Sequence, residues 1–304
     1  MKKIFVYSLL FAVCSLLGQN AQGQLLYRVQ GNGLKAPSYV IGTYHLAPVT
    51  FVDSIPGLHE ALDNCEQVYG ELDMQDMMKK ENMDKLQQAQ MLPEGKRLRE
   101  LFDKDQLGRL NALMRDVMGV DLDNDAVAKQ LDQVSPAALS ATLTMMVCMK
   151  KTPGFNPADL FDGWFQKMAL AANKPVKGFE TVEFQAKVLY DTPLEQQVED
   201  LMCMVDNFMD VQEMVDFITA AFFAQDLDQL GELFAEEMEG PCSGNPEENA
   251  KLIDNRNAEW LKQMPSIMKE KPTFFAVGAG HLVGPQGLLE QLRQMGYEVE
   301  GVRK

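Results

Sequence analysis

Short apolar runs separated by turn residues open the chain after residue 24. The runs 25–31 and 37–45 flank a Gly-Asn-Gly turn, as the two strands of a β-hairpin do. Apolar residues at helical spacing follow over 55–67, and a strand-like run covers 68–74. This order of strands and a helix predicts an α/β unit.

The rest of the chain is a long helical stretch followed by a second α/β unit. Residues 76–272 have mostly the helical period, which a strand-like run over 174–180 interrupts. Residues 272–302 then contain a strand, a glycine-rich turn, a helix and a last strand. We therefore predict an α/β (α+β) fold with a central mixed β-sheet flanked by helices. A large helical insertion over about 76–172 is expected to form a lid or wall over one edge of the sheet.

The first 23 residues have the pattern of a secretory signal peptide. Two lysines precede an apolar run over 4–17, and small residues stand just before Gln24. The run is too short to span a bilayer comfortably, and no later segment resembles a membrane helix. We expect cleavage before Gln24, a single domain over 24–304, and a periplasmic or secreted protein. A lipid anchor at Cys14 is the second choice, because the bulky Val13 before it suits lipoprotein processing poorly.

The chain is strongly acidic, with a formal charge of −16. Phosphate backbones and anionic lipids should be repelled, so we expect no nucleic-acid partner. After signal cleavage the remaining cysteines could form one or two disulfides in an oxidising compartment. No C-x-x-C spacing occurs, and the sequence does not choose the pairing. The candidates are Cys65, Cys148, Cys203 and Cys242.

Two of the three histidines in the chain occupy equivalent places. VIGTYH ends at His45 and AVGAGH ends at His281, so each histidine follows an apolar run and a glycine at the same spacing. In α/β sheets, ligands bind at the carboxyl ends of the strands, and glycine allows a ligand to approach closely. The repeated pattern favours one shared function over two unrelated structural histidines. Since neither histidine lies on an apolar face, alanine at either position is expected to leave the fold intact.

Acidic residues end two other strand-like runs. Glu71 lies at the end of one run and Glu180 at the end of another. If these strands are neighbours, both carboxylates converge with the two imidazoles, which should then lie within about 8 Å of each other. Imidazoles with one or two carboxylates suit Mn²⁺, Zn²⁺ or Co²⁺. The sequence therefore predicts a divalent-metal site whose ligands are His45, His281, Glu71 and Glu180. A metal-bound water would be the nucleophile, and the carboxylate left free would be the general base.

Longer motifs surround these residues, in an order that is specific as a set. They are Gly42-Thr43-Tyr44-His45, Glu71-Leu72-Asp73, the segment GFETVEFQ (178–185), the segment RNAEW (256–260) and Gly278-Ala279-Gly280-His281. On these motifs the chain resembles the TraB/GumN family, which includes PrgY and the Tiki metalloproteases, over about residues 25–304. The resemblance implies a fold like that of the erythromycin esterase and ChaN proteins. It also implies a divalent-metal protease, with Glu71, Glu180 and Arg256 as catalytic residues.

Two further residues have competing interpretations. Arg256 is expected at the rim of the pocket, where a fixed cation would bind a substrate carboxylate or stabilise an oxyanion. Its residue type alone would indicate a surface ion pair, and the family motif favours the site. The segment HEALD (59–63) begins like the zinc signature H-E-x-x-H, but Asp63 replaces the second histidine. We therefore expect His59 on a solvated helix face.

Two functions fit this sequence. The first is a metal-dependent hydrolase of the periplasm or cell exterior that acts on a peptide or small-molecule substrate, with peptides favoured. The alternative is a non-catalytic protein that captures a peptide, a metal or a small ligand in the same pocket. Bound metal with an open coordination position would favour the hydrolase.

Overall fold

The computed structural model describes residues 24–152, 154–238, 242 and 246–303. The predicted signal peptide, with Cys14, lies outside these residues. Within them, no helix combines the length and the hydrophobicity needed to cross a membrane.

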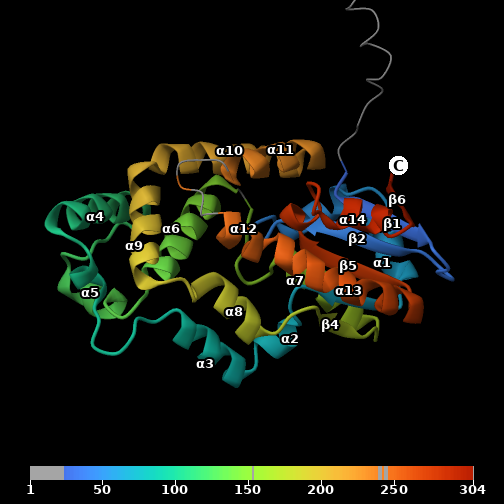
Figure 1. Ribbon diagram of the computed structural model, residues 1–304, viewed down its shortest axis with the longest axis horizontal. Coiled ribbons are helices and arrows are strands. Elements are labelled where there is room, and N and C mark those ends of the chain that lie inside the picture. The colour runs from blue at the N-terminus through green and yellow to red at the C-terminus, as the bar shows by residue number, and fades with distance from the viewer. Residues whose placement is uncertain (1–23, 153, 239–241, 243–245, 304) are drawn as a thin grey trace, which may run out of the picture.

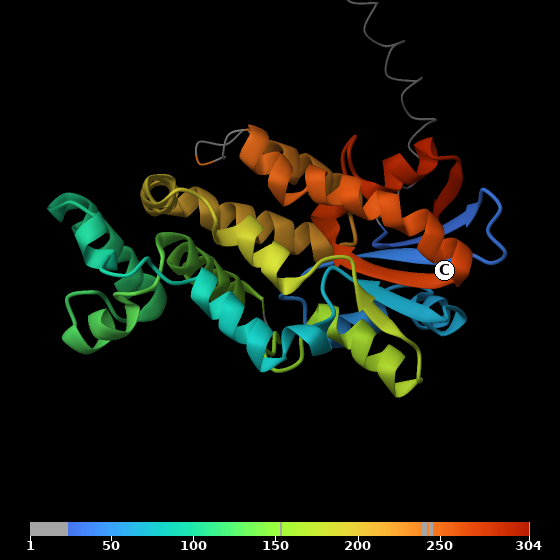
Figure 2. The same ribbon diagram turned by 60° about the horizontal axis from the view of Figure 1, so that its bottom comes forward.

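The chain forms a β-sheet with helices on both faces and a further group of helices at one end of the sheet (Figure 1). Figure 2 shows the long helix α13 (Asp254–Glu270), in orange, on the opposite face of the sheet from α7 (Phe161–Ala171), in yellow-green. The other helices are α1 (Leu58–Asn64), α2 (Met74–Met77), α3 (Lys80–Ala89), α4 (Lys104–Met118), α5 (Asp125–Leu131), α6 (Pro136–Lys151), α8 (Val182–Tyr190), α9 (Leu194–Asp206), α10 (Phe208–Phe223), α11 (Leu227–Met238), α12 (Pro246–Leu252) and α14 (Leu288–Gln294). Short 3₁₀ turns cover Val49–Ser54, Leu98–Leu101 and Ala279–His281.

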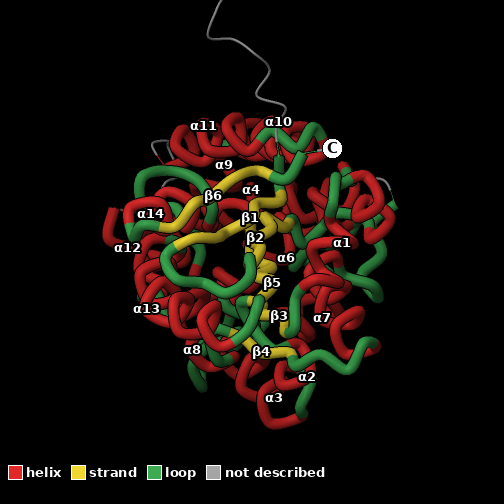
Figure 3. Tube along the Cα trace, turned by 90° about the vertical axis from the view of Figure 1, so that its right-hand side faces the viewer, coloured by secondary structure: helices red, strands yellow, loops and turns green. Residues whose placement is uncertain are grey.

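The sheet has six strands in the order β4-β3-β5-β2-β1-β6 (Figure 3). Strands β4, β3, β5 and β2 are mutually parallel, whereas β1 is antiparallel to both β2 and β6. The α/β class and the mixed sheet predicted from the sequence are confirmed. The strands are β1 (Leu26–Gly31), β2 (Ser38–Thr43), β3 (Gln67–Gly70), β4 (Val176–Gly178), β5 (Thr273–Gly278) and β6 (Tyr297–Gly301).

The central strands are buried on both faces, which is why their sequences are nearly unbroken apolar runs. All of β2 is buried, and β5 is buried from Thr273 to Val277. On one face, Phe165 of α7 stacks on Phe274 with ring centroids 5.4 Å apart. On the other, Trp260 of α13 is fully buried in the same core. This double covering fixes the strands rigidly, and with them the residues at their ends.

A second hydrophobic core lies among the helices beyond the sheet. Residues of α4, α6 and α9 build it. The insertion was predicted over about 76–172, but α9 comes later in the chain than this range. By contrast, α7 lies inside that range but packs on the sheet. Leu46, just past β2, belongs to the second core, so these helices adjoin the carboxyl end of β2. This is where a lid or wall would have to be, and that role stays a prediction.

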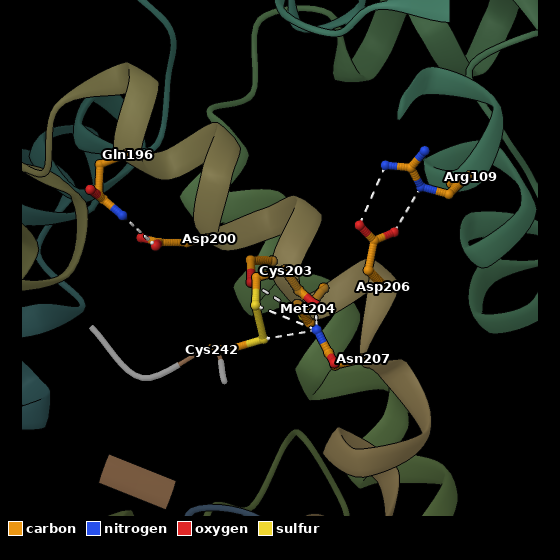
Figure 4. Close-up of a disulfide and its surroundings, with 9 residues drawn as sticks. Arg109, Gln196, Asp200, Cys203, Met204, Asp206, Asn207 and Cys242 are labelled. Atoms are coloured by element: carbon orange, nitrogen blue, oxygen red, sulfur yellow. Dashed lines mark hydrogen bonds and ion pairs between the residues drawn. A yellow bond between two sulfur atoms is a disulfide. The ribbon is translucent and has the colours of Figure 1, made fainter. Parts of the chain in front are cut away.

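One disulfide joins α9 to the segment between α11 and α12 (Figure 4). It links Cys203 and Cys242, which are 39 residues apart. The side chain of Asn207 donates to the carbonyl of Cys203 at 2.9 Å, which ties the bridge to the end of α9. Cys65 and Cys148 are free thiols, and both are buried. Of the one or two predicted disulfides, the structure therefore contains one.

Removing this disulfide should destabilise the protein substantially. For the Cys203→Ser/Cys242→Ser variant we expect the free energy of unfolding to fall by about 2–4 kcal/mol, because a bridge that closes a loop of this length restricts the unfolded chain. Urea denaturation of the wild type and the variant, each with and without dithiothreitol, would measure the loss. Dithiothreitol should destabilise the wild type and leave the variant unchanged. Equal midpoints for oxidised and reduced wild type would contradict the prediction.

Candidate functional site

The parallel strands end at one edge of the sheet, and the predicted site residues follow these ends. In the strand register Gly70 pairs with both Ala276 and Gly178, so β3 and β4 end level with each other and β5 runs two residues further, to Gly278. Glu71 follows β3 directly, and Glu180 lies two residues beyond β4. The carboxyl edge therefore brings together side chains that are far apart in sequence.

Arg256 lies at the centre of this edge. The sequence had predicted a position at the rim. Its side chain is 8% exposed and contacts two carboxylates. It donates to Glu180 through Nε at 2.8 Å and through a terminal nitrogen at 2.9 Å, and to Glu71 at 2.6 Å. The other terminal nitrogen donates to the carbonyl of Leu252 and to Nε2 of His281, both at 3.1 Å. One guanidinium thus links both glutamates and one of the two predicted histidines.

The contacts of His281 determine which ring nitrogen carries its proton. The amide nitrogen of Asn257 donates to the carbonyls of His281 and Gln286, so its oxygen faces the ring and accepts from Nδ1 at 2.8 Å. Since Arg256 can only donate, Nε2 must present its lone pair. Burial lowers the pKa of His281 to about 4, so the ring is neutral at pH 7. His281 is therefore held as the Nδ1–H tautomer.

His281 also lies on an apolar face, which contradicts the expectation from the sequence. Its ring is 4.3 Å from the ring of Trp260, centroid to centroid, and the residue is only 3% exposed. Alanine at this position would remove packing as well as chemistry. We therefore no longer expect His281→Ala to leave the fold intact.

Glu71 is an ionised carboxylate whose oxygens are all engaged. One oxygen accepts from the backbone N–H of Gly278 at 2.8 Å, and the other accepts from Arg256 and from Gln185, the latter at 3.2 Å. Burial acts to raise the pKa of Glu71, but in the acid range, where His281 is protonated as well, the positive charges of His281, Arg256 and His45 outweigh it and lower the pKa to about 2. Glu180 likewise accepts from Arg256 and, at 2.9 Å, from the indole N–H of Trp260. Neither carboxylate is placed as a free base.

The glycines of the two G-x-x-H motifs have structural roles. A side chain at Gly42 would meet the backbone of Ala279 at 3.1 Å, because the two motifs pack against each other. At Gly278 the backbone N–H donates a hydrogen bond to Glu71. The close approach that these glycines allow is between segments of the chain.

His45 lies at the same edge with a partner of its own. Its Nδ1 donates to a carboxylate oxygen of Asp162, on α7, at 2.7 Å, and the hydroxyl of Thr43 donates to the other oxygen. The His45 side chain is 68% exposed, whereas that of Asp162 is 20% exposed. The charge of Asp162 raises the pKa of His45 to about 9, so the ring is mainly an imidazolium at pH 7. Its Nε2 is left for solvent or a ligand.

The four predicted metal ligands do not converge on one position. His45 is held by Asp162, and the guanidinium of Arg256 fills the space among Glu71, Glu180 and His281. Among the residues that the structure describes, no group of three or more His, Cys, Asp or Glu side chains is placed to hold a metal ion. As they are arranged, these residues do not fit a divalent cation, and metal ligation by them stays a prediction.

A cavity of about 290 Å³ borders the cluster on the side of β4. It offers room for part of a ligand next to Glu180. The residues that line it are Leu72, Asp73, Asp76, Lys177, Gly178, Glu180, Thr181 and Val182.

Comparison with known proteins assigns this arrangement to a family. The model of the TraB/PrgY/gumN family matches residues 25–301, which is nearly all of the described chain. The chain belongs to this family. It is 24% identical to "Metalloprotease TIKI2" of Danio rerio, over 93% of this chain and 62% of that protein. It is 26% identical to "Metalloprotease TIKI1" of Homo sapiens, over 87% of this chain and 59% of that protein.

This TraB/PrgY/gumN protein is a distant relative of those metalloproteases. The chain spans about three fifths of the length of the curated relatives it matches. No solved structure shows significant similarity to it.

Two polar residues of this family member's site were missed in the sequence. Asp162, the partner of His45, is one of 44 acidic residues and has no motif that sets it apart. Asn257, the partner of His281, stands beside Arg256 in the RNAEW motif, and this motif was the only sequence signal that could have pointed to it. By contrast, His59 was interpreted correctly as lying on a solvated helix face, where its side chain is 57% exposed and pairs with Asp53.

The contrast between the two G-x-x-H histidines can be measured by NMR. The chain has only three histidines, so their ring signals can be assigned by single substitutions. We expect His45 to titrate near pH 9 and, in Asp162→Asn, to fall toward the ordinary pKa of 6.5, because Asp162 is the main cause of the shift. The raised pKa means that the His45–Asp162 pair stabilises the fold fully below pH 6.5 and loses this contribution as pH rises through 9. An unchanged His45 titration in Asp162→Asn would contradict this assignment.

Proposed function

We propose that this protein is a hydrolase that cleaves peptides in the periplasm or outside the cell, with His45 as its reacting side chain. The observation that carries the proposal is an exposed imidazole fixed by a carboxylate beside a buried charge cluster. Family membership and the names of the metalloprotease relatives support a peptide substrate. The disulfide and the leader-like N-terminal sequence support an oxidising compartment.

His45 is suited to exchange a proton with a bound substrate. Asp162 engages Nδ1 and fixes the ring orientation, so Nε2 is the atom that meets the substrate. As an imidazolium it would donate a proton to the departing nitrogen of a cleaved peptide bond or hydrogen-bond a developing oxyanion. We assign these roles to His45 because its ring is both ionisable and open to solvent.

The buried cluster would organise the site and set its charge. Glu71 and Glu180 accept hydrogen bonds from Arg256, Gly278 and Trp260, so we assign them to holding Arg256 and not to general-base catalysis. This replaces the roles that the sequence suggested for the two carboxylates. The names of the relatives imply a metal, but no step is assigned to one because the residues as arranged do not fit it.

The engaged state of both carboxylates also favours a second function, binding without catalysis. A protein of this kind would use the same edge and the cavity beside Glu180 to hold a peptide.

A peptide-library assay separates the two functions. The purified protein would be incubated with the library with added Mn²⁺ and with a chelator, and the products identified by mass spectrometry. We expect cleavage that His45→Ala abolishes and His59→Ala retains. Binding of library peptides without cleavage under either condition would reject the hydrolase in favour of the binding protein.

A further inference from the structure

The groups around Arg256 form the kind of ligand set that a divalent cation takes. The guanidinium donates hydrogen bonds to two carboxylates and one imidazole, at distances between 2.6 and 3.1 Å. Carboxylate and imidazole together are the usual ligands of Mn²⁺ and Zn²⁺ in proteins. In this structure they surround a covalently attached cation.

The orientation of each group confirms that all three face the same positive charge. Asn257 holds His281 with the Nε2 lone pair toward Arg256, which is also the orientation that a metal ligand needs. Glu71 and Glu180 direct oxygens at the same guanidinium nitrogen. With a neutral His281, two negative charges face one positive charge, so the cluster has a net charge of about −1 and a dication would balance it better.

We propose that the guanidinium of Arg256 occupies the place of a divalent cation among Glu71, Glu180 and His281, so that the side chain and the metal compete for one site. The competition follows from geometry, because each lone pair that would bind the metal is already engaged by an N–H of Arg256. The metal then binds only when Arg256 is withdrawn. The proposal does not depend on peptidase activity, since it concerns binding alone.

Removing Arg256 should therefore create a high-affinity metal site. Mn²⁺ binding would be measured by electron paramagnetic resonance and by calorimetry on the full chain. We expect Arg256→Ala to bind one Mn²⁺ at least about tenfold more tightly than the wild type, within the usual range for coupled equilibria. In the Arg256→Ala background, Glu71→Gln should remove this binding.

A matched control is offered by Arg99, which pairs with the nearly buried carboxylate of Asp132 in the helical region. Arg99→Ala also leaves a carboxylate without its partner. The contacts of this pair, however, bring no second carboxylate or imidazole against Asp132. We expect this variant to bind Mn²⁺ no better than the wild type. A similar gain in Arg99→Ala would show that any uncovered carboxylate suffices, and would overturn the proposal.

The remaining outcomes also decide the question. Equal Mn²⁺ affinity in wild type and Arg256→Ala would rule out competition, and a folded Arg256→Ala that binds no Mn²⁺ would rule out the site. If Arg256→Ala is unfolded, refolding by Mn²⁺ supports the proposal, because a ligand of the native state stabilises it. If Mn²⁺ does not refold it, Arg256→Lys decides: tighter Mn²⁺ binding than wild type supports the proposal, and unchanged binding overturns it.

Discussion

Replacing Arg256 with methionine is expected to lower the free energy of unfolding by about 3–5 kcal/mol, because it leaves buried carboxylates without their counter-charge. The side chains of Glu71 and Glu180 are only 14% and 4% exposed, so water cannot take over the role of the guanidinium. Methionine has a similar length and would keep much of the packing against Trp260. The loss should therefore come mainly from the uncompensated charge. Urea denaturation followed by circular dichroism would measure it.

A surface arginine provides the control for this substitution. Arg28 pairs with Glu300, and their side chains are 40% and 62% exposed. Arg28→Met should change the free energy of unfolding by no more than about 0.5 kcal/mol, as is usual for exposed ion pairs. Adding Glu180→Gln to Arg256→Met should recover part of the loss, since one buried charge is removed. A loss below about 1 kcal/mol in Arg256→Met would mean that the cluster is not a buried ionic network of the usual kind.

Replacing His45 with alanine is expected to lower kcat by about 10²–10⁴-fold, the range found when a general acid or base is removed. The fold should survive, because the ring is largely exposed. The measurement is the rate of cleavage of the best library peptide, with thermal unfolding recorded alongside. Activity and stability are thus separable at this position.

His59 gives a control of nearly the same chemistry. It is an exposed histidine that donates to an aspartate at 2.9 Å, as His45 does to Asp162 at 2.7 Å. His59→Ala should retain full activity. Equal losses in the two variants would point to a general effect of histidine removal and would contradict a specific role for His45. His281→Ala is a poorer probe, because a buried ring that packs on Trp260 is expected to affect stability as well.

The strands and the edge they share were predictable because burial leaves a strong trace in sequence. β2 and β5 are covered on both faces, so their apolar runs are continuous, and each run is followed by a glycine that stands three residues before a histidine. Parallel neighbours end at a common edge, so Glu71 and Glu180 could be expected near His281.

The pairings within the site were not predictable, because they depend on which helix covers which face. Periodicity shows that α7 has an apolar side, but not that this side lies on the sheet and brings Asp162 to His45. In the same way, a charged residue such as Arg256 is usually exposed, and only its two glutamate partners make its central, buried position possible. The pattern of residue types therefore predicted which edge of the sheet holds the site. It did not show that the side chain of Arg256 fills the centre of that site.

The position of β5 in the sheet has a consequence for how the protein is made. This strand lies between β2 and β3, although about 200 residues separate it from β3 along the chain. A nascent chain cannot join β2 to β3 in one sheet until residues 273–278 are available. Until then β1 and β2 can pair only with each other, and the edges of β2 and β3 that face β5 stay open, a state in which such segments are prone to aggregate. We therefore expect slow folding after synthesis is complete, and chains truncated before β5 to be degraded or insoluble instead of partly active.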